Sequence, residues 1–360
     1  MRTLTGYVSR LFLVHVALML FSFVALLQLI DLLNNTDRLV ERHGKSLMVL
    51  FRYMGYRLPE LIAFIVPFAV LLAALLVLSR LAQSAEVLAL KAAGVSYYRI
   101  LLAFLPSGLL VAALHFAIAD QLAPVATRAM TEWDAGVDEL DSHSTADPTS
   151  GIWIRDGLTL VRVNSVARRG ALLRGVTLFE RDANHDFFAR ITAQRATYDN
   201  GSWLLFDVER FAPTPGGSGI QRYLQWPWAT ALLPAHFSDL AATPASLSLM
   251  QLHAFAAQRD VGGHPTYFYE TWMNRRMALP TISLIMVLLA APVAQSLQRQ
   301  RGVALGLMLG IGMGFLFFIV DGLLQALGES GMLPPILAAW SPAILFAIVG
   351  TASLVRVEGQ

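Results

Sequence analysis

Six apolar stretches, each about as long as a membrane-spanning helix, limit what this sequence can fold into. A helix of about 20 residues crosses the roughly 30 Å hydrocarbon core of a bilayer. Three of the stretches precede a long central region and three follow it. They lie near residues 11–33, 59–79, 99–120, 277–297, 303–327 and 333–355. The sequence therefore predicts an α-helical integral membrane protein with six transmembrane helices (3+3), divided into two helical halves, 1–120 and 277–360, and an inserted domain, 121–276.

The composition is that of a membrane protein, with 56% hydrophobic and 14% charged residues, against about 45–50% and about 25% in soluble domains. The formal net charge of +2 is too small to indicate nucleic acid as a partner. The chain has no cysteine, which excludes a disulfide, a thiolate nucleophile and any cysteine-ligated metal or iron–sulfur site.

The central region changes to short β-branched runs separated by turn residues. In "IWIRDGLTLVRV" (152–163) the runs are interrupted by Asp-Gly, and further turn clusters follow at 182–186 and 199–201. Asn-Gly between hydrophobic runs is a strong hairpin signal, because both turn positions tolerate positive φ. We expect successive antiparallel strands in an all-β sandwich or jelly-roll-like domain. A loop at 212–219 ("APTPGGSG") and a short helix from about Ser246 should follow.

The spans place the termini and the 80–98 segment on one side, and the 34–58 loop and the central domain on the other. Short loops on the terminal side carry more Arg and Lys, which favours the cytoplasm for that side. The inserted domain is therefore expected outside the cytoplasm.

A short amphipathic helix is predicted at about 82–94, between the second and third spans. Glu86 lies in its first turn, where the helix dipole favours a carboxylate, and Gly94 suits the position after its end. Val87 and Leu90 share its apolar face. Such a helix either lies on lipid or enters a groove of a partner protein, and Glu86 beside the apolar face favours the groove.

Two aspartates and a glycine ladder stand out within the spans. Asp31 and Asp321 would each cost about 2.5–3.5 kcal/mol at mid-bilayer on insertion scales, so they should face a protein or aqueous interior. Gly302, Gly306, Gly310 and Gly314 recur every four residues in the fifth span, with Gly312 between them, and such a stripe lets another backbone approach closely. That backbone belongs either to the same chain or to another subunit.

Basic residues follow the first span. If this segment is helical, Arg38, Arg42 and Lys45 share one face at i, i+4 and i+7 spacing. They either snorkel at the membrane interface, with Asp37 and Glu41 as partners, or bind an anionic ligand.

No catalytic, cofactor or metal motif emerges. "HGKS" (43–46) lacks the first glycine of a phosphate-binding loop, and "DSHSTAD" (141–147) is a polar loop without a positioned partner. The histidines show no metal-ligand spacing. We therefore expect no nucleotide, cofactor or metal site in this chain.

Three motifs together resemble a known family. "LAQSAEVLALKAAGVS" resembles the coupling-helix segment of the lipopolysaccharide export permeases LptF and LptG, with Glu86 at the family's glutamate. "GIWIRDG" resembles the signature that opens the β-domain in the LptG branch rather than the LptF branch. "FFIVDGLLQALGESGMLPPILAAWSP" resembles the fifth span, its aspartate and the start of the sixth.

This resemblance implies a permease subunit of an ATP-driven exporter in the inner membrane of a Gram-negative bacterium. Its helix with Glu86, Val87 and Leu90 would sit in a groove of an LptB-like ATPase dimer, which uses ATP-Mg. An LptF-like sister permease and an LptC-like single-span protein with a β-domain would complete the complex. Lipopolysaccharide would leave the outer leaflet laterally, past a helix interface or gate that includes Asp31, Asp321 and the glycine ladder, and enter a periplasmic β-bridge.

The chain departs from the family near the outer end of the first span. Where family members carry lysines, it has Gln28, Asn34 and Asn35. Arg38, Arg42 and Lys45 come slightly later and are the candidate phosphate contacts. Two other readings remain: a polytopic membrane enzyme acting on lipid or peptide, and a permease of another ATP-driven system, such as lipoprotein release, which usually has four spans.

Overall fold

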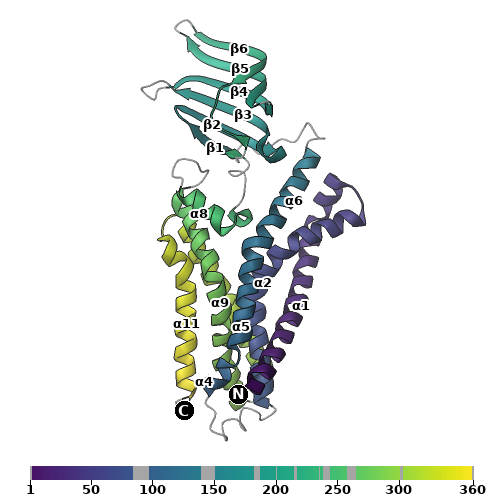
Figure 1. The fold of residues 1–360 in the computed structure, drawn as a ribbon, viewed down its shortest axis with the longest axis vertical. Coiled ribbons are helices and arrows are strands. Elements are labelled where there is room, and N and C mark those ends of the chain that lie inside the picture. The colour runs from purple at the N-terminus through teal and green to yellow at the C-terminus, as the bar shows by residue number, and fades with distance from the viewer. Residues whose placement is uncertain are drawn as a thin grey trace. The chain divides into compact units, whose positions relative to one another are not determined.

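The computed structural model describes residues 2–83, 97–138, 151–181, 187–199, 201–214, 217–234, 236–237, 244–257, 265–300 and 303–358. The chain forms two compact units. A helical unit comprises Met1–Thr127 and Tyr267–Gln360, and the second unit comprises Arg128–Thr266. Figure 1 shows helices in the first and a sheet in the second.

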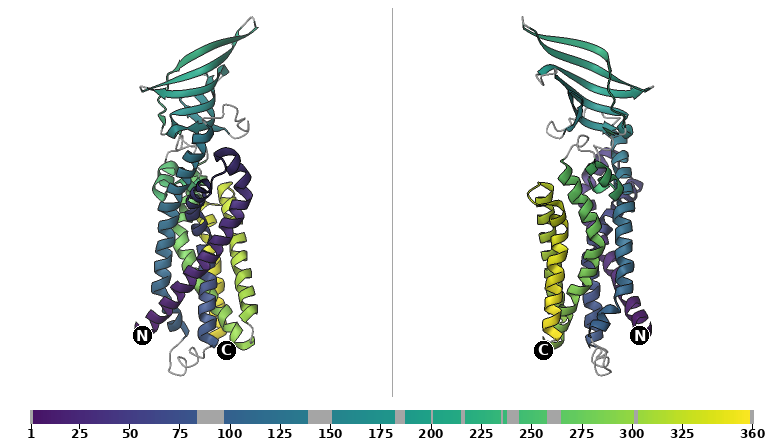
Figure 2. Two further views of the ribbon diagram at one scale, coloured as in Figure 1. Left: turned by 90° about the vertical axis from the view of Figure 1, so that its right-hand side faces the viewer. Right: turned by 60° about the vertical axis from the view of Figure 1, so that its left-hand side comes forward.

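Six helices of the described chain are long and apolar enough to cross a membrane. This confirms the prediction of three spans on either side of an insertion. The candidate spans are Leu4–His43, Leu47–Leu81, Leu105–Asp134, Thr266–Ala294, Met308–Glu329 and Pro335–Arg356. Five of them belong to single helices: α1 (Arg2–His43), α2 (Leu47–Gln83), α9 (Thr266–Gln300), α10 (Val303–Glu329) and α11 (Pro335–Glu358). The third span consists of α5 (Leu105–Ala117), the π-helical segment Ile118–Leu122 and α6 (Ala123–Asp138). The short helix α4 (Tyr97–Leu102) precedes α5. Figure 2 shows both termini at the same end of this unit.

The prediction of a loop at 34–58 is wrong, because this segment is almost entirely helical. Helix α1 continues to His43, Gly44 turns at φ +81°, and α2 begins at Leu47. The apolar stretches in the sequence end where polar residues begin, whereas each helix continues as long as one of its faces packs against a neighbouring helix. Leu39 and Tyr53 are only 5% and 3% exposed, so packing persists beyond the apolar stretches.

The core of the helical unit lies around α2 and α9, which have the most buried apolar windows among the spans. Every residue from Ile65 to Leu75 in α2 is buried, as expected of a helix that is hydrophobic all round. Aromatic edge-to-face pairs join the other helices of this unit to one another. Phe12 meets Phe104 at a centroid distance of 5.3 Å, and Phe317 of α10 meets Phe346 of α11 at 5.2 Å.

The second unit contains one antiparallel sheet with its strands in sequence order. The strands are β1 (Ile152–Asp156), β2 (Thr159–Ala167), β3 (Leu172–Arg181), β4 (Phe187–Asp199), β5 (Ser202–Thr214) and β6 (Gly217–Trp228). Gly157 and Gly201 adopt positive φ in the β1–β2 and β4–β5 turns, where the sequence predicts hairpins. The inserted antiparallel domain is confirmed. The described strands form a single sheet in which each strand pairs with its sequence neighbour, a meander, whereas the expected sandwich or jelly roll would have two packed sheets.

The prediction of a loop at 212–219 is also wrong, because most of this segment belongs to β5 and β6. Ala212 pairs with Gly219 and Thr214 with Gly217, so the hairpin between β5 and β6 is much tighter than expected. Trp203 anchors one side of the sheet, since it is 2% exposed, donates from Nε1 to the Leu232 carbonyl at 2.8 Å, and packs against Phe237 at 5.2 Å. A 3₁₀ turn, Pro244–Ser246, and α8 (Leu249–Ala257) follow, close to the expected short helix.

Candidate functional site

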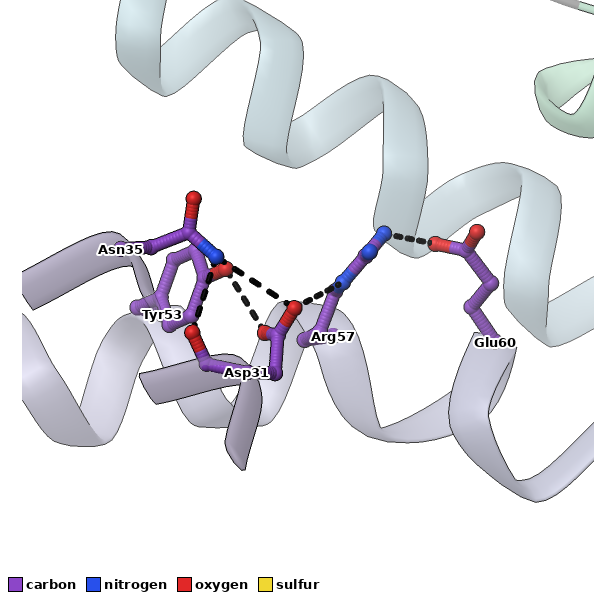
Figure 3. A network of polar contacts seen from close by, with 5 residues as sticks. All are labelled: Asp31, Asn35, Tyr53, Arg57 and Glu60. Carbon is purple, nitrogen blue, oxygen red and sulfur yellow. Dashed lines mark hydrogen bonds and ion pairs between the residues drawn. The ribbon is translucent and has the colours of Figure 1, made fainter. Parts of the chain in front are cut away.

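A polar network joins the upper part of α1 to the start of α2 (Figure 3). Asp31 accepts a hydrogen bond from the Tyr53 hydroxyl at 2.7 Å and an ion-pair contact from Arg57 Nε at 3.4 Å. Asn35, one turn after Asp31, donates to the Asp31 carbonyl at 2.8 Å, and Arg57 also pairs with Glu60 at 2.5 Å. Spacing of i, i+4 and i+7 places Tyr53, Arg57 and Glu60 on one face of α2. The network thus fixes two helices side by side where both become polar.

Asp31 lies where the sequence analysis places it, toward protein, with its side chain 14% exposed. Its partners Tyr53 and Arg57 were missed, because no sequence pattern connects residues on two helices 22 and 26 positions apart. Gln28 lies one turn earlier and is 5% exposed. Among the described residues, neither atom of its amide group has a hydrogen-bond partner.

The three basic residues after the first span do not form one helical face. Arg38 and Arg42 lie on α1 and are exposed, but α1 ends at His43, so Lys45 lies in the turn before α2. Positive φ at Gly44 ends the helix. All three side chains are nevertheless exposed near the tip of the α1–α2 hairpin.

Asp321 of α10 is buried and paired. Arg275 of α9 donates from Nη2 to its carboxylate at 2.8 Å, and the two side chains are 24% and 8% exposed. The adjacent Arg276 is buried as well, and it interacts electrostatically with Asp120 in the π-helical segment. Two consecutive arginines therefore connect α9 to two different neighbours. Asp321 is conspicuous in the sequence as a charge within an apolar stretch, whereas neither arginine is.

A second polar contact holds the centre of the helical unit. His115 is 1% exposed, with Nδ1 at 2.9 Å from Ser283 Oγ and Nε2 at 2.9 Å from the Ala63 carbonyl oxygen. One side chain of α5 thereby joins α9 and α2. His115 therefore has a role in helix packing.

The glycine ladder packs within the same chain where its surroundings are described. A Cβ at Gly310 would lie 2.5 Å from Leu75 Cδ2, and one at Gly314 would lie 2.5 Å from Phe68 Cδ2, both on α2. A Cβ at Gly312 would meet nothing within 4 Å. Of the two alternatives, the structure supports contact with another helix of this chain for Gly310.

Several candidates lie outside what the structure describes. Glu86, Val87 and Leu90 fall in 84–96, and Gly302 is likewise outside the described residues. Gly306 lies within α10, but its contacts are not described.

Comparison with known proteins agrees with this architecture. The family described as "Lipopolysaccharide export system permease LptF/LptG" matches residues 6–356. The chain is 25% identical over 299 residues to the lipopolysaccharide export system permease protein LptG of Haemophilus influenzae, covering 82% of this chain and 83% of that protein. It is 24% identical over 307 residues to the protein of the same name from Escherichia coli K12, covering 84% of each. With a match across nearly its whole length, and with six candidate spans around an antiparallel sheet, the chain belongs to the LptF/LptG family of lipopolysaccharide export system permeases.

Proposed function

We propose that this chain is the LptG-type subunit of an ATP-driven complex that extracts lipopolysaccharide from the inner membrane of a Gram-negative bacterium. The observation that carries the proposal is the family match over residues 6–356 on a chain with three candidate spans, a sheet domain and three further spans. The relatives named LptG and the "GIWIRDG" motif, which forms β1 and its turn, favour the LptG type over the LptF type.

In this proposal the chain moves substrate and a partner hydrolyses ATP. The predicted coupling segment, 82–94, begins at the end of α2 and precedes α4. Because α2 is the most buried span, a displacement at its end is transmitted to the helices packed around it. An LptB-like ATPase dimer carrying ATP-Mg would supply that displacement through Glu86, Val87 and Leu90.

The substrate path in this proposal involves the least buried spans, α1 and α10. Their outward side chains include Phe21 of α1 at 79% exposed and Met308 of α10 at 70%, which suits contact with acyl chains or with an LptF-like sister permease. Arg38 and Arg42, exposed near the end of α1, would attract lipopolysaccharide phosphates through charge-assisted hydrogen bonds. The sheet domain would lie on the periplasmic side and join an LptC-like β-domain in the bridge that receives the substrate.

The two rival readings are less well supported. The family match argues for a transport subunit over a membrane enzyme. Six candidate spans argue against a permease of the four-span type used in lipoprotein release.

The proposal is tested by purifying the tagged chain from its native membranes and identifying the bound proteins and lipid by mass spectrometry. We expect a sister six-span permease, an ATPase, a single-span protein with a β-domain, and lipopolysaccharide. Recovery of an ATPase together with lipoprotein in place of lipopolysaccharide would overturn the assigned substrate. Recovery of the chain with no ATPase would overturn the ATP-driven mechanism.

A further inference from the structure

The first three turns of α2, Leu47–Leu58, are not needed for α2 to cross the membrane. The helix has 37 residues, and at 1.5 Å per residue it is about 55 Å long, whereas the hydrocarbon core is about 30 Å thick. The apolar stretch that accounts for crossing begins at residue 59. Leu47–Leu58 therefore precedes the crossing segment.

Pro59 separates this segment from the rest of α2. Proline has no N–H to donate to the carbonyl of Gly55, four residues earlier, and such positions are where helices bend. In Figure 1 the first turns of α2 run across the view before the helix turns to run lengthwise. The view on the left of Figure 2 shows the same change of direction.

The segment has one buried and one uncovered face. Tyr53, on the inner face, is 3% exposed and donates a hydrogen bond to Asp31. On the outer face, Leu47 and Met48 are each 74% exposed and Phe51 is 68% exposed. Leu47 and Phe51 share that face at i and i+4 spacing, and Leu58, 41% exposed, continues it at i+11.

Cations and a tyrosine border the uncovered apolar face. Lys45 is exposed in the turn before α2, and Arg52 is exposed beside Phe51. Arg52 donates from Nε to the Tyr56 hydroxyl at 3.1 Å, with its guanidinium carbon 5.6 Å from the Tyr56 ring centre. Apolar side chains bordered by Lys, Arg and Tyr fit the boundary between acyl chains and phosphates of a bilayer, where aromatic rings and cationic heads lie at headgroup depth.

We infer that Leu47–Leu58 is an in-plane membrane anchor. Leu47, Met48 and Phe51 enter the acyl chains of the leaflet on the hairpin side, and Arg52 binds a phospholipid phosphate. The anchor fixes the depth of the α1–α2 hairpin, and with it the depth of the polar network around Asp31. The occupant is the phospholipid surface, because the flanking cations complement phosphates and the segment directly adjoins a membrane-crossing helix.

The lack of native cysteine permits nitroxide labels at single introduced cysteines in the full chain. The chain is purified with its accompanying subunits and placed in nanodiscs of phosphatidylethanolamine and phosphatidylglycerol. Oxygen partitions into acyl chains and a charged nickel chelate stays in water, so the ratio of the two relaxation effects reports depth. Met48→Cys and Phe51→Cys are compared with Ile344→Cys on the outer face of α11, 55% exposed, and with Ser202→Cys, exposed at the start of β5 in the sheet domain.

If the segment is an anchor, labels at 48 and 51 should favour oxygen over nickel, as the label at 344 does, but at a shallower depth. The ratio should also be the same before and after addition of lipopolysaccharide. A ratio equal to that at 202 would place the face in water and overturn the inference. Protection from both reagents would assign the face to a partner subunit, and oxygen exposure that appears only with lipopolysaccharide would assign it to substrate. Either result also overturns the anchor, and all three leave the proposed export function intact.

Discussion

At the scale of single residues, each of the two aspartates predicted within the spans lies beside a cation on another helix. Arg275 pairs with Asp321 at 2.8 Å, and Arg57 approaches Asp31 at 3.4 Å. A charge in hydrocarbon is expensive, and a partner removes part of that cost. The sequence indicated the two aspartates because any charge in an apolar stretch is conspicuous. It did not indicate the cations, because both lie near the polar ends of their helices and their partners are distant in sequence.

Removal of Arg275 should destabilise the helical unit. Arg275→Ala leaves the Asp321 carboxylate buried without its partner, and breaking a buried pair in this way costs about 3–5 kcal/mol. The double variant Arg275→Met with Asp321→Leu should recover much of the loss. Arg222→Ala is the control, because its pair with Glu209 is exposed and such pairs contribute about 0–1 kcal/mol. Thermal unfolding in detergent measures all three, and equal unfolding temperatures for Arg275→Ala and Arg222→Ala would contradict the assignment.

The basic residues at the tip of the hairpin should affect substrate binding without affecting folding. Replacement of Arg38, Arg42 and Lys45 by Ala removes three exposed cations, and we expect at least a tenfold loss of affinity for lipopolysaccharide, or about 1.4 kcal/mol. Arg10→Ala, exposed near the other end of α1, should bind normally. Lipopolysaccharide bound to the purified protein is the measurement, and equal amounts in the triple variant and wild type would show that these side chains only snorkel.

At the scale of elements, α10 approaches α2 closely at Gly310 but not at Gly312. A Cβ at Gly310 would come within 2.5 Å of Leu75, whereas one at Gly312 would meet open space. Gly310→Leu should therefore force the helices apart and cost about 1–3 kcal/mol, a typical value for overpacking. Gly312→Leu places the same side chain on the outer face of α10 and should be tolerated. If thermal unfolding shows equal losses for the two variants, α10 does not pack on α2 in this register.

Most of the predicted coupling helix at 82–94 lies outside the described residues, which resume at residue 97 after α2 ends at Gln83, so its role stays a prediction from sequence. Glu86→Ala should remove one partner of a buried charge pair with the ATPase and cost about 2–5 kcal/mol of docking free energy. Co-purification of the ATPase and growth of cells that depend on this chain are the readouts. Glu41→Ala, exposed in the last turns of α1, is the control. Normal ATPase recovery and growth with Glu86→Ala would mean that the segment only rests on the membrane.

At the scale of the whole molecule, the sequence was informative where one kind of residue dominates a long segment. Apolar runs indicated all six candidate spans, and Asp156-Gly157 and Asn200-Gly201 indicated hairpins that the strand pairing contains. It failed at 34–58, where helices continue because buried side chains such as Tyr53 pack on a partner helix. It also failed at 212–219, where strand pairing tolerates residues that usually interrupt strands. Such features depend on contacts between distant segments, which local composition does not report.

The six-span arrangement also makes a prediction about topology. Cysteines introduced at residue 150 and at Lys45 should react with a membrane-impermeant reagent added from the periplasm. A cysteine introduced at Gly94 should react only after the inner membrane is permeabilised. The absence of native cysteine gives a clean background. Labelling of residue 150 from the cytoplasm would reverse the orientation and contradict a periplasmic sheet domain.

The central claim is that this chain couples ATP hydrolysis by a partner to the extraction of lipopolysaccharide. The most direct test is a reconstituted complex in liposomes that contain lipopolysaccharide, with a separate periplasmic β-domain acceptor carrying a photo-crosslinker. The account predicts acceptor-bound lipopolysaccharide that increases with time only when ATP-Mg is supplied, and little or none with Glu86→Ala. Transfer at the same rate without ATP, or none from a wild-type complex that hydrolyses ATP, would contradict it.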